Sequence, residues 1–599
     1  MRSPGPEEPI VIIGAGPAGL TAARELTRAG RRPIVVEKRA RVGGLARTEL
    51  FKGFRFDMGG HRFFTKVEEV KTIWRAVLGD DLLRRPRLSR IYYDRRFFYY
   101  PLRPLNALLR LGPFVAAAIV LSYLRWQLFP HPREDTFEQW VTNRFGRRLF
   151  LIFFKTYTEK VWGIPCSELR AEWAAQRIKD LSLKTALLHM LVRPPTTITT
   201  LIDEFEYPRL GPGMMWEAVA AEIQRHHAVL RLNNDVVSVR RTGCRIDAVV
   251  VRAAGREEVI EGSHFISSMP VTELVAKLSP APPADVRAAA AKLVYRDFLT
   301  VCLIVRKPAL FPDNWIYVHS PEVRVGRIQN FKNWSPDMVP DAAKTSLGLE
   351  YFCSENDGLW NMPDAELIEL GKRELEQIGL ARAADVEDGC VFRNDKAYPV
   401  YDAGYRDCLA TVRAFVDGLA NLQTIGRNGL HRYNNQDHAM LTGALAARNL
   451  LFDQHNDLWI VNTEPEYHEQ LLTDVDVTPE HLARILELGL NTLFAKLDRV
   501  AFGLSVGAAS GVALFLATVF VVLSGNLLVR PSLGLLGQYF PGYSVTPAGT
   551  IVGLAYGLVV GFVAGWSFAL LRNASLFLWV AVLRRRASYH LVRRFVEFI

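Results

Sequence analysis

The residues best suited to chemistry lie in a glycine-rich segment near the N-terminus. A Gly-x-Gly-x-x-Gly motif is formed by Gly14, Gly16 and Gly19, with Pro17 and Ala18 between the last two glycines. Gly14 permits a tight turn, Gly16 lets the backbone approach a pyrophosphate, and Gly19 lets a helix pack closely on a strand. Backbone N–H groups at the start of that helix can hold phosphate oxygens. The motif therefore predicts a dinucleotide site.

The elements around the motif have the order that such a site needs. A β-branched run, Ile10–Ile13, precedes it, a helical pattern covers Leu20–Ala29, and a second strand is predicted at Pro33–Val36. Glu37 follows that strand directly, where a carboxylate can accept hydrogen bonds from ribose hydroxyls. A Rossmann-type fold is therefore predicted for this region.

A glycine pair, Gly43 and Gly44, follows this strand and favours FAD over NAD as the cofactor. The segment resembles the extended FAD-binding pattern of the amine oxidases and related flavoenzymes, which NAD domains do not usually carry. The residues that the resemblance assigns to the cofactor are Lys38, Gly44, Leu45, Ala46 and Arg47. The sequence holds no second full Gly-x-Gly-x-x-Gly motif, so we do not expect a separate nicotinamide domain.

Later segments are expected to complete the flavin site. In the same superfamily a residue at the position of Val236, in a strand predicted over Leu230–Val239, packs on adenine. A second predicted strand, Leu422–Ile425, runs into a glycine, and a helix is predicted over Ala439–Asn449. A helix N-terminus at this place can stabilise negative charge on a reduced flavin. The flavin-side residues expected here are Gly426, Arg427, Asp437 and Met440.

Four stretches resemble the UDP-galactopyranose mutase branch of this superfamily. They are Phe56–Thr65, which contains Gly60 and His61; Phe145–Gly146 with Phe153–Trp162; Arg324–Lys332; and Gly426–Asp437. The second and fourth discriminate best, because ordinary amine oxidases lack the Tyr-Thr-x-Lys-x-Trp run. The resemblance implies a reaction on reduced FAD without net oxidation. In that reaction flavin N5 attacks the anomeric carbon of a sugar, the nucleotide diphosphate leaves, and the opened ring recloses as a furanose.

The resemblance also implies roles for individual side chains. His61 is expected beside the flavin and Trp162 as an apolar wall, while Arg177 and Arg327 clamp the diphosphate and Tyr433 donates to it. Structural alternatives stay open for three of them. Arg177 is also expected on the surface of a helix over Glu172–Leu183, Arg327 as an exposed strand residue, and Trp162 as part of the core.

Two long uncharged stretches near the C-terminus predict a membrane anchor. Gly503–Leu523 and Ala548–Leu571 are each long enough to cross the hydrocarbon core. Arginines precede the first stretch and follow the second, and only Arg530 lies in the connection between them. The positive-inside rule therefore places the two outer flanks in the cytoplasm. Gly503, Gly507 and Gly511 are spaced to let the two helices approach. The shorter apolar stretch Leu111–Leu124 is expected as a buried or interfacial helix.

The expected fold class is α/β: a Rossmann-type FAD-binding domain with a mixed α+β substrate domain and two transmembrane helices. We assign FAD-binding parts to residues 1–90, 211–280 and 401–477. The substrate domain takes its helical part from 91–210 and its sheet part from 281–400. A linker helix (478–499), the two membrane helices (500–572) and a basic cytoplasmic tail (573–599) follow.

Charge and cysteine content restrict the partners. Of a net charge of +11 on 599 residues, the last 109 residues carry nine Lys/Arg and two Asp/Glu. Cations beside apolar segments point to a membrane surface, and no nucleic-acid partner is expected. Six widely spaced cysteines predict reduced thiols and no metal site. The expected location is the inner membrane with the catalytic part in the cytoplasm; the oligomeric state stays open.

Departures from the mutase pattern leave the substrate open. Asn435 stands where the mutase segment usually has an acid, and soluble sugar-nucleotide mutases need no membrane anchor. The sugar is therefore either nucleotide-linked or carried on a polyprenyl (di)phosphate, and recruitment to a membrane glycosyltransferase explains the anchor equally well. The first alternative is an FAD-dependent oxidoreductase, similar to protoporphyrinogen oxidases or desaturases, that acts on an apolar membrane substrate. A flavin-binding scaffold without activity is the second.

Overall fold

The structure is a computed structural model that describes residues 8–100, 102, 106, 110–171, 204–462, 497–524 and 530–596. The chain divides into two compact units, Met1–Leu471 and Leu472–Ile599. Arg177, the helix predicted over Glu172–Leu183 and most of the predicted linker helix lie outside the described residues. Each unit is described below by itself.

A parallel sheet forms the nucleotide-binding centre of the first unit. Its strand order is β20 (Leu422–Thr424), β13 (His264–Ser267), β1 (Ile10–Ile13), β2 (Ile34–Val36) and β9 (Val229–Arg231). The β-branched β1 lies in the middle, with Ile12 paired to Val35 on one side and to Ile266 on the other. The predicted Rossmann-type fold is confirmed. Its strands come from residues within 1–90, 211–280 and 401–477.

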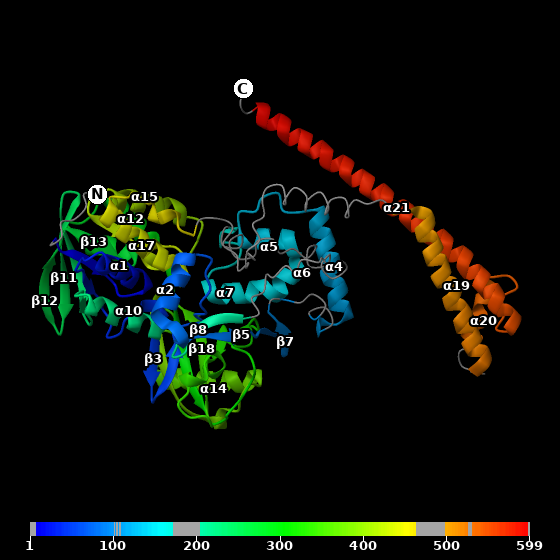
Figure 1. Ribbon diagram of the computed structural model, residues 1–599, viewed down its shortest axis with the longest axis horizontal. Helices are drawn as coiled ribbons and strands as arrows, with labels where there is room; N and C mark the ends of the chain where they lie inside the picture. The colour runs from blue at the N-terminus through cyan, green and yellow to red at the C-terminus, as the bar shows by residue number, and fades with distance from the viewer. Residues whose placement is uncertain are drawn as a thin grey trace. The chain divides into compact units, whose positions relative to one another are not determined.

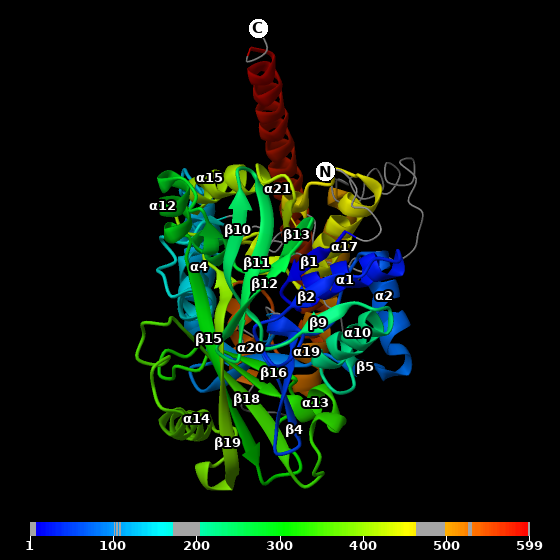
Figure 2. The ribbon, with the colours of Figure 1, turned by 90° about the vertical axis from the view of Figure 1, so that its left-hand side faces the viewer.

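Four helices cover one face of this sheet. They are α1 (Pro17–Arg28), α2 (Glu68–Leu78), α10 (Gly213–Arg225) and α17 (Gln436–Phe452). Their apolar residues form one buried cluster with the inward side chains of β1, including Ile10 and Ile12. In Figure 2, α1, α2 and α10 lie to the right of the strands.

The opposite face carries a small sheet and three further helices. The sheet has the order β12 (Arg256–Glu261), β11 (Arg245–Ala253), β10 (Asp235–Thr242) and β14 (Leu278–Ser279). The helices are α11 (Val271–Lys277), α12 (Ala284–Lys292) and α15 (Tyr405–Asp417). Val11 and Ile13 of β1 share a core with this layer.

The single strand predicted over Leu230–Val239 is wrong. The segment makes two strands, β9 and β10, which belong to different sheets. Asn233 between them has φ +56, and Asn is one of the few residues that tolerates this left-handed conformation. The chain therefore turns at a residue that interrupts an otherwise strand-like run.

A seven-stranded mixed sheet forms the second half of the unit. Its order is β19 (Val386–Pro399), β15 (Tyr295–Val305), β18 (Thr345–Cys353), β17 (Arg327–Asn330), β16 (Trp315–Val318), β6 (Ser89–Tyr93) and β7 (Arg96–Tyr99). Neighbours are antiparallel except for β16 and β6. Helix α14 (Asp364–Ile378) packs on one face of the sheet, and a helical group packs on the other.

The helical group packs on the seven-stranded sheet and is coloured cyan in Figure 1. It consists of α4 (Pro113–Leu128), α5 (Phe137–Phe145), α6 (Arg147–Phe150), a π-helical turn (Leu151–Lys155) and α7 (Thr156–Trp162). Smaller elements complete the unit: β3 (Thr48–Phe51), β4 (Phe54–Asp57), β5 (Leu82–Pro86), β8 (Glu204–Pro208), α13 (Phe331–Trp334) and α16 (Gly426–Gly429).

The second unit is a helical hairpin. Helix α19 (Arg499–Ser524) packs along α21 (Pro547–Val596), with the short α20 (Arg530–Gly534) in the connection. Arg499–Ser524 and Pro547–Ser575 are long and apolar enough to cross a membrane. Cβ atoms built at Gly507 and Gly561 would lie 2.6 Å from Leu558 O and 2.9 Å from the Gly507 Cα, respectively. The predicted close approach at Gly507 is therefore confirmed, and a glycine on the partner helix matches it.

Candidate active site

The first glycine motif forms a cradle in which Gly14 and Gly19 leave no room for a side chain. Gly14 has φ +98, and a Cβ built there would lie 2.2 Å from Ser268 Oγ. A Cβ at Gly19 would lie 2.0 Å from Gly14 O, so the third glycine allows α1 to pack on β1. Gly14, Gly16, Pro17 and Ala18 line one cavity, into which the N-terminal turn of α1 opens. The geometry is that of a pyrophosphate site.

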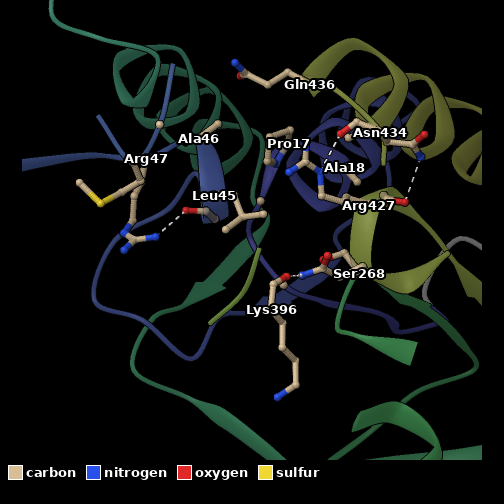
Figure 3. Close-up of a pocket in the computed structure, with 18 of the residues that line it drawn as sticks. Pro17, Ala18, Leu45, Ala46, Arg47, Ser268, Lys396, Arg427, Asn434 and Gln436 are labelled. Atoms are coloured by element: carbon tan, nitrogen blue, oxygen red, sulfur yellow. Dashed lines mark hydrogen bonds between the residues drawn. The ribbon is translucent and has the colours of Figure 1, made fainter. Parts of the chain in front are cut away.

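The second glycine pair folds back onto the first. A Cβ at Gly44 would lie 3.2 Å from the Gly16 Cα, and Gly43 N donates to Ala15 O at 2.8 Å. Arg47 Nη1 donates to Gly44 O at 3.0 Å and its Nε to Glu49 at 2.6 Å. Burial lowers the pKa of Arg47. Residues 14–19 and 43–47 thus form one wall, which Figure 3 shows with Pro17, Leu45 and Arg47.

Glu37 lines the cavity at the end of β2, where the ribose of a dinucleotide is expected. Its carboxylate accepts from Ala15 N at 2.8 Å and from Arg39 N at 2.9 Å, and the side chain is 7% exposed. Lys38 and Arg39 both pair with Asp395 of β19, at 2.9 and 2.5 Å. A carboxylate oriented in this way can accept from ribose hydroxyls, as the sequence predicts.

One cavity of about 370 Å³ connects these loops to the seven-stranded sheet. Most of the predicted site residues line it: the cradle residues, Glu37, Lys38, Gly44, Leu45, Ala46, Arg47, Gly60, His61, Val236, Arg327, Gly426, Arg427, Tyr433 and Asp437. Sequence reasoning missed other lining residues, among them Ser268, Phe298, Tyr398 and Asn434. Ser268, Phe298 and Tyr398 lie outside every motif of the sequence, and Asn434 lies inside the Gly426–Asp437 stretch without having been singled out.

Three predicted residues lie behind the cavity wall. Gly19 acts in helix packing, as described above. Met440 is fully buried, and its Sδ accepts from Trp74 Nε1 at 3.1 Å. Trp162 is 1% exposed and lies 6.2 Å from Tyr398 and 6.0 Å from Tyr433, between ring centroids. Trp162 therefore packs behind Tyr398 and Tyr433, and these two tyrosines line the cavity.

His61 lines the cavity as a neutral ring. Burial, together with the nearby charges of Arg427 and Arg327, lowers its pKa to about 4. Its Nε2 lies 2.8 Å from Met58 O. Because a carbonyl oxygen can only accept, Nε2 carries the proton of the neutral ring and Nδ1 is the acceptor.

Arg327 is held by a buried carboxylate. Its Nε donates to Glu350 at 2.9 Å, a second N–H donates to the same oxygen, and Nη2 lies 3.3 Å from Tyr398 Oη. Burial alone would lower the pKa of Arg327, but Glu350 raises it well above its usual value. The side chain is 17% exposed, so the exposed-strand alternative is wrong.

Arg427 keeps its charge facing the cavity. Its Nε donates to Asn434 O at 2.8 Å (Figure 3). Its Nη1 donates to Ala397 O at 2.9 Å. The guanidinium lies 4.4 Å from the ring centre of Tyr433, and Tyr433 stacks on Tyr398 at 5.6 Å. Among the described residues no carboxylate forms an ion pair with Arg427, so it is the stronger candidate for an anion.

Lys160, the lysine of the Tyr-Thr-x-Lys-x-Trp run, has a structural position. Its Nζ donates to the carbonyls of Val318, Ser320 and Val325 at 3.3, 2.7 and 3.2 Å. Burial lowers its pKa to about 8. The lysine fixes the loop between β16 and β17, and thereby the start of the strand that carries Arg327.

Residues 17–451 match the family described as flavin containing amine oxidoreductase. The chain belongs to this family. The match covers the seven-stranded sheet and the parallel sheet apart from β1, and the cofactor of this family member is FAD. The cradle, the oriented Glu37 and the paired glycine loops described above fit that cofactor.

Relatives of known sequence match over short segments. Putrescine oxidase of Kocuria rosea is 48% identical over 54 residues, which are 9% of this chain and 11% of the relative. The matches span about a tenth of the length of the first curated relatives.

Two solved structures show the same fold over most of this amine oxidoreductase. Reduced UDP-galactopyranose mutase has a TM-score of 0.66 at 22% identity and covers 76% of this chain and 98% of its own. A protein assigned as a protoporphyrinogen oxidase, from Exiguobacterium sp. 255-15, has a TM-score of 0.58 at 17% identity, over 75% of this chain and 99% of its own.

Proposed function

We propose that this FAD enzyme converts a pyranose into a furanose on a phosphate- or diphosphate-linked sugar, as UDP-galactopyranose mutases do. One observation carries the proposal: Arg327, Arg427, Tyr398 and Tyr433 line the same cavity as the FAD-binding loops. Guanidinium groups and phenolic hydroxyls are donors that suit phosphate oxygens.

The charge of the cavity favours an anionic substrate over an amine. Eight Lys and Arg side chains line it against five Asp and Glu. The pyrophosphate of FAD accounts for part of this excess. Glu350 pairs with Arg327, whereas no carboxylate in the described part of the chain forms an ion pair with Arg427. An ammonium substrate would meet a like charge at this wall, whereas a phosphate would gain a charge-assisted hydrogen bond.

The chain's own residues would position the substrate and hold protons. When bound, reduced FAD supplies a nucleophilic ring nitrogen without net electron transfer. Arg427 would bind the departing phosphate, and the phenolic hydroxyls of Tyr398 and Tyr433 would orient it. His61 would present Nδ1 as an acceptor, because its other ring nitrogen donates to Met58 O. Trp162 would exclude water behind the two tyrosines.

We further propose that the two apolar helices anchor the enzyme in a membrane, with both flanks in the cytoplasm. The lengths of Arg499–Ser524 and Pro547–Ser575 and the arginines outside them support this orientation. An anchored catalytic unit suits a sugar on a polyprenyl phosphate or diphosphate, or a membrane glycosyltransferase that uses the product.

An FAD-dependent oxidation of a membrane substrate is the second candidate. The family match and the name putrescine oxidase among the curated relatives favour it. The apolar side chains of Phe298 and Trp315 in the cavity would suit such a substrate. In such an oxidation the substrate would carry no anion, and Arg427 would have no role in binding it.

Activation by reduction tests the proposal. The purified holoenzyme, in its oxidised form and after dithionite, is incubated with nucleotide-linked and polyprenyl-linked pyranoses, and products are separated by chromatography. We expect a furanose product from the reduced enzyme only, and at least a tenfold loss in Arg427→Met; the exposed Arg252→Met is the matched control. Product that forms only from the oxidised enzyme would contradict the proposal.

A further inference from the structure

Helix α4 exposes an apolar face that a soluble protein would not leave in water. Positions 114, 117, 121, 124 and 128 recur on one side of the helix. Phe114 is 90% exposed, Leu121 67% and Leu128 74%. A surface helix usually carries polar residues there, whereas α4 is apolar on its outer face as well.

The opposite face of α4 is fixed to the catalytic unit. Ile119 and Tyr123 are 1% and 8% exposed and belong to the core that also contains Trp162 and Tyr398. A Cβ at Gly146 would lie 2.8 Å from the Tyr123 Cα, so α4 packs backbone-to-backbone on the α5–α6 junction. Arg148 N also donates to Ser122 Oγ at 3.1 Å. The outer face is therefore held rigidly, on the same core that supports the cavity wall.

The charges around α4 favour a lipid surface as the occupant. Arg110 precedes the helix, Arg125 lies exposed in its last turn, and the chain from 110 to 129 contains no Asp or Glu. Trp126 lies beside Arg125, with 5.9 Å between the guanidinium and the ring centre. Apolar side chains bordered by arginines and an aromatic residue are the pattern of a helix that lies in the interface of an anionic bilayer. In a second copy of this chain the same face would bring like charges together.

We propose that α4 is a membrane-docking surface of the catalytic unit, separate from the helical hairpin. The helix would lie in the bilayer plane with Phe114, Leu121 and Leu128 in the lipid. This inference rests on the proposed membrane association but not on the proposed chemistry. It extends that proposal to the substrate, because docking through α4 would hold the catalytic unit on the leaflet that contains lipid-linked sugars.

Lipid-borne quenchers at three positions test the inference. In the full chain with Cys244→Ser, a fluorescent label is attached in turn to Leu121→Cys (α4), Leu516→Cys (α19) and Val259→Cys (β12). Leu516 and Val259 are 57% and 43% exposed, and Val259 is the matched apolar control in the catalytic unit. Each protein is reconstituted into vesicles of phosphatidylcholine and phosphatidylglycerol with spin-labelled lipid, and flavin absorbance verifies that each variant is folded.

The inference predicts at least a twofold loss of fluorescence at positions 121 and 516 and no change at 259. Quenching at 516 without quenching at 121 would overturn the docking surface and leave the anchor intact. Cross-linking between copies at 121, without quenching, would overturn it in favour of a second copy. Absence of quenching at both 121 and 516 would overturn the docking surface together with the proposed membrane association.

Discussion

At the scale of single residues, the ion pair between Arg327 and Glu350 limits anion binding where the seven-stranded sheet lines the cavity. Glu350 is fully buried and also accepts from Gln329 Nε2 at 2.5 Å. Removing one partner of a buried pair leaves the other charge without compensation. Arg327 is therefore held in place by its neighbour and is less available to an anion than its sequence position suggests.

We predict that Glu350→Gln destabilises the protein by about 3 kcal/mol, because it leaves a buried guanidinium unpaired. The exposed Glu387→Gln, which removes a surface partner of Lys344, should cost under about 1 kcal/mol. Urea unfolding of the detergent-solubilised protein measures both. Equal losses in the two variants would contradict the structural role of Glu350.

His61 predicts a dependence of stability on pH. Its pKa is about 4 in the folded chain against 6.5 for an ordinary histidine. Between these values the unfolded chain binds more protons, so this contribution to the free energy of unfolding is complete above pH 6.5 and decreases as the pH falls toward 4. His61→Gln should reduce the slope by up to about 1.4 kcal/mol per pH unit. Unfolding curves between pH 5 and 7 test this, with the exposed His226→Gln as control; an unchanged slope would be contrary to the prediction.

The residues of the cofactor cradle were predictable because their roles are local. Gly14, Gly16, Gly19 and Glu37 lie within 24 residues of one another. Backbone geometry dictates the glycines, and the end of the second strand places the carboxylate. The partners of Arg327 could not be predicted in this way. Arg327 meets Glu350 only because β17 and β18 pair in one register, and a single sequence carries no signal for such a pairing.

At the scale of elements, close glycine contacts hold the C-terminal hairpin together. Cβ atoms built at Gly557, Gly561 and Gly565 would all lie within 3.1 Å of the facing helix. The sequence predicts the first row of glycines through its spacing of four. It also contains the second row, with the same spacing, in the stretch that reads as the second span. Two rows facing each other let the backbones meet.

We predict that Gly507→Val separates the two helices. Its side chain would collide with Leu558 O, and overpacking of this kind costs about 1–3 kcal/mol. The neighbouring Ala508→Val points to the exposed side of α19 and is the matched control. Thermal unfolding in detergent measures the difference, and equal melting temperatures for the two variants would refute the packing.

Other elements show where local patterns mislead. Strongly periodic or β-branched segments, such as β1 and α1, have the predicted type and nearly the predicted bounds. The run over Leu230–Val239 fails because its apolar pattern continues through a turn at Asn233. The apolar Leu111–Leu124 stretch forms a helix, but only its packing shows which face is left outside.

At the scale of the whole molecule, the chain joins a catalytic unit to a helical hairpin. The division at Leu471 and Leu472 separates the FAD site from both candidate spans. We predict that the full chain resists extraction from membranes at alkaline pH. A chain ending at Leu471 keeps the interfacial α4 but neither span, and we expect alkaline extraction to release it in a yellow form. Fractionation with flavin absorbance measures both properties. Resistance of the shortened chain, or a colourless product, would contradict this division of tasks.

The most direct measurement of the central claim is a count of electrons during turnover. The reduced holoenzyme is mixed anaerobically with an excess of a phosphate-linked pyranose, without any acceptor, while flavin absorbance and product are followed together. The proposed reaction predicts many product molecules per flavin while the flavin remains reduced. Absence of product from the reduced enzyme, together with bleaching of the flavin when the oxidised enzyme is mixed with the same substrate, would contradict it.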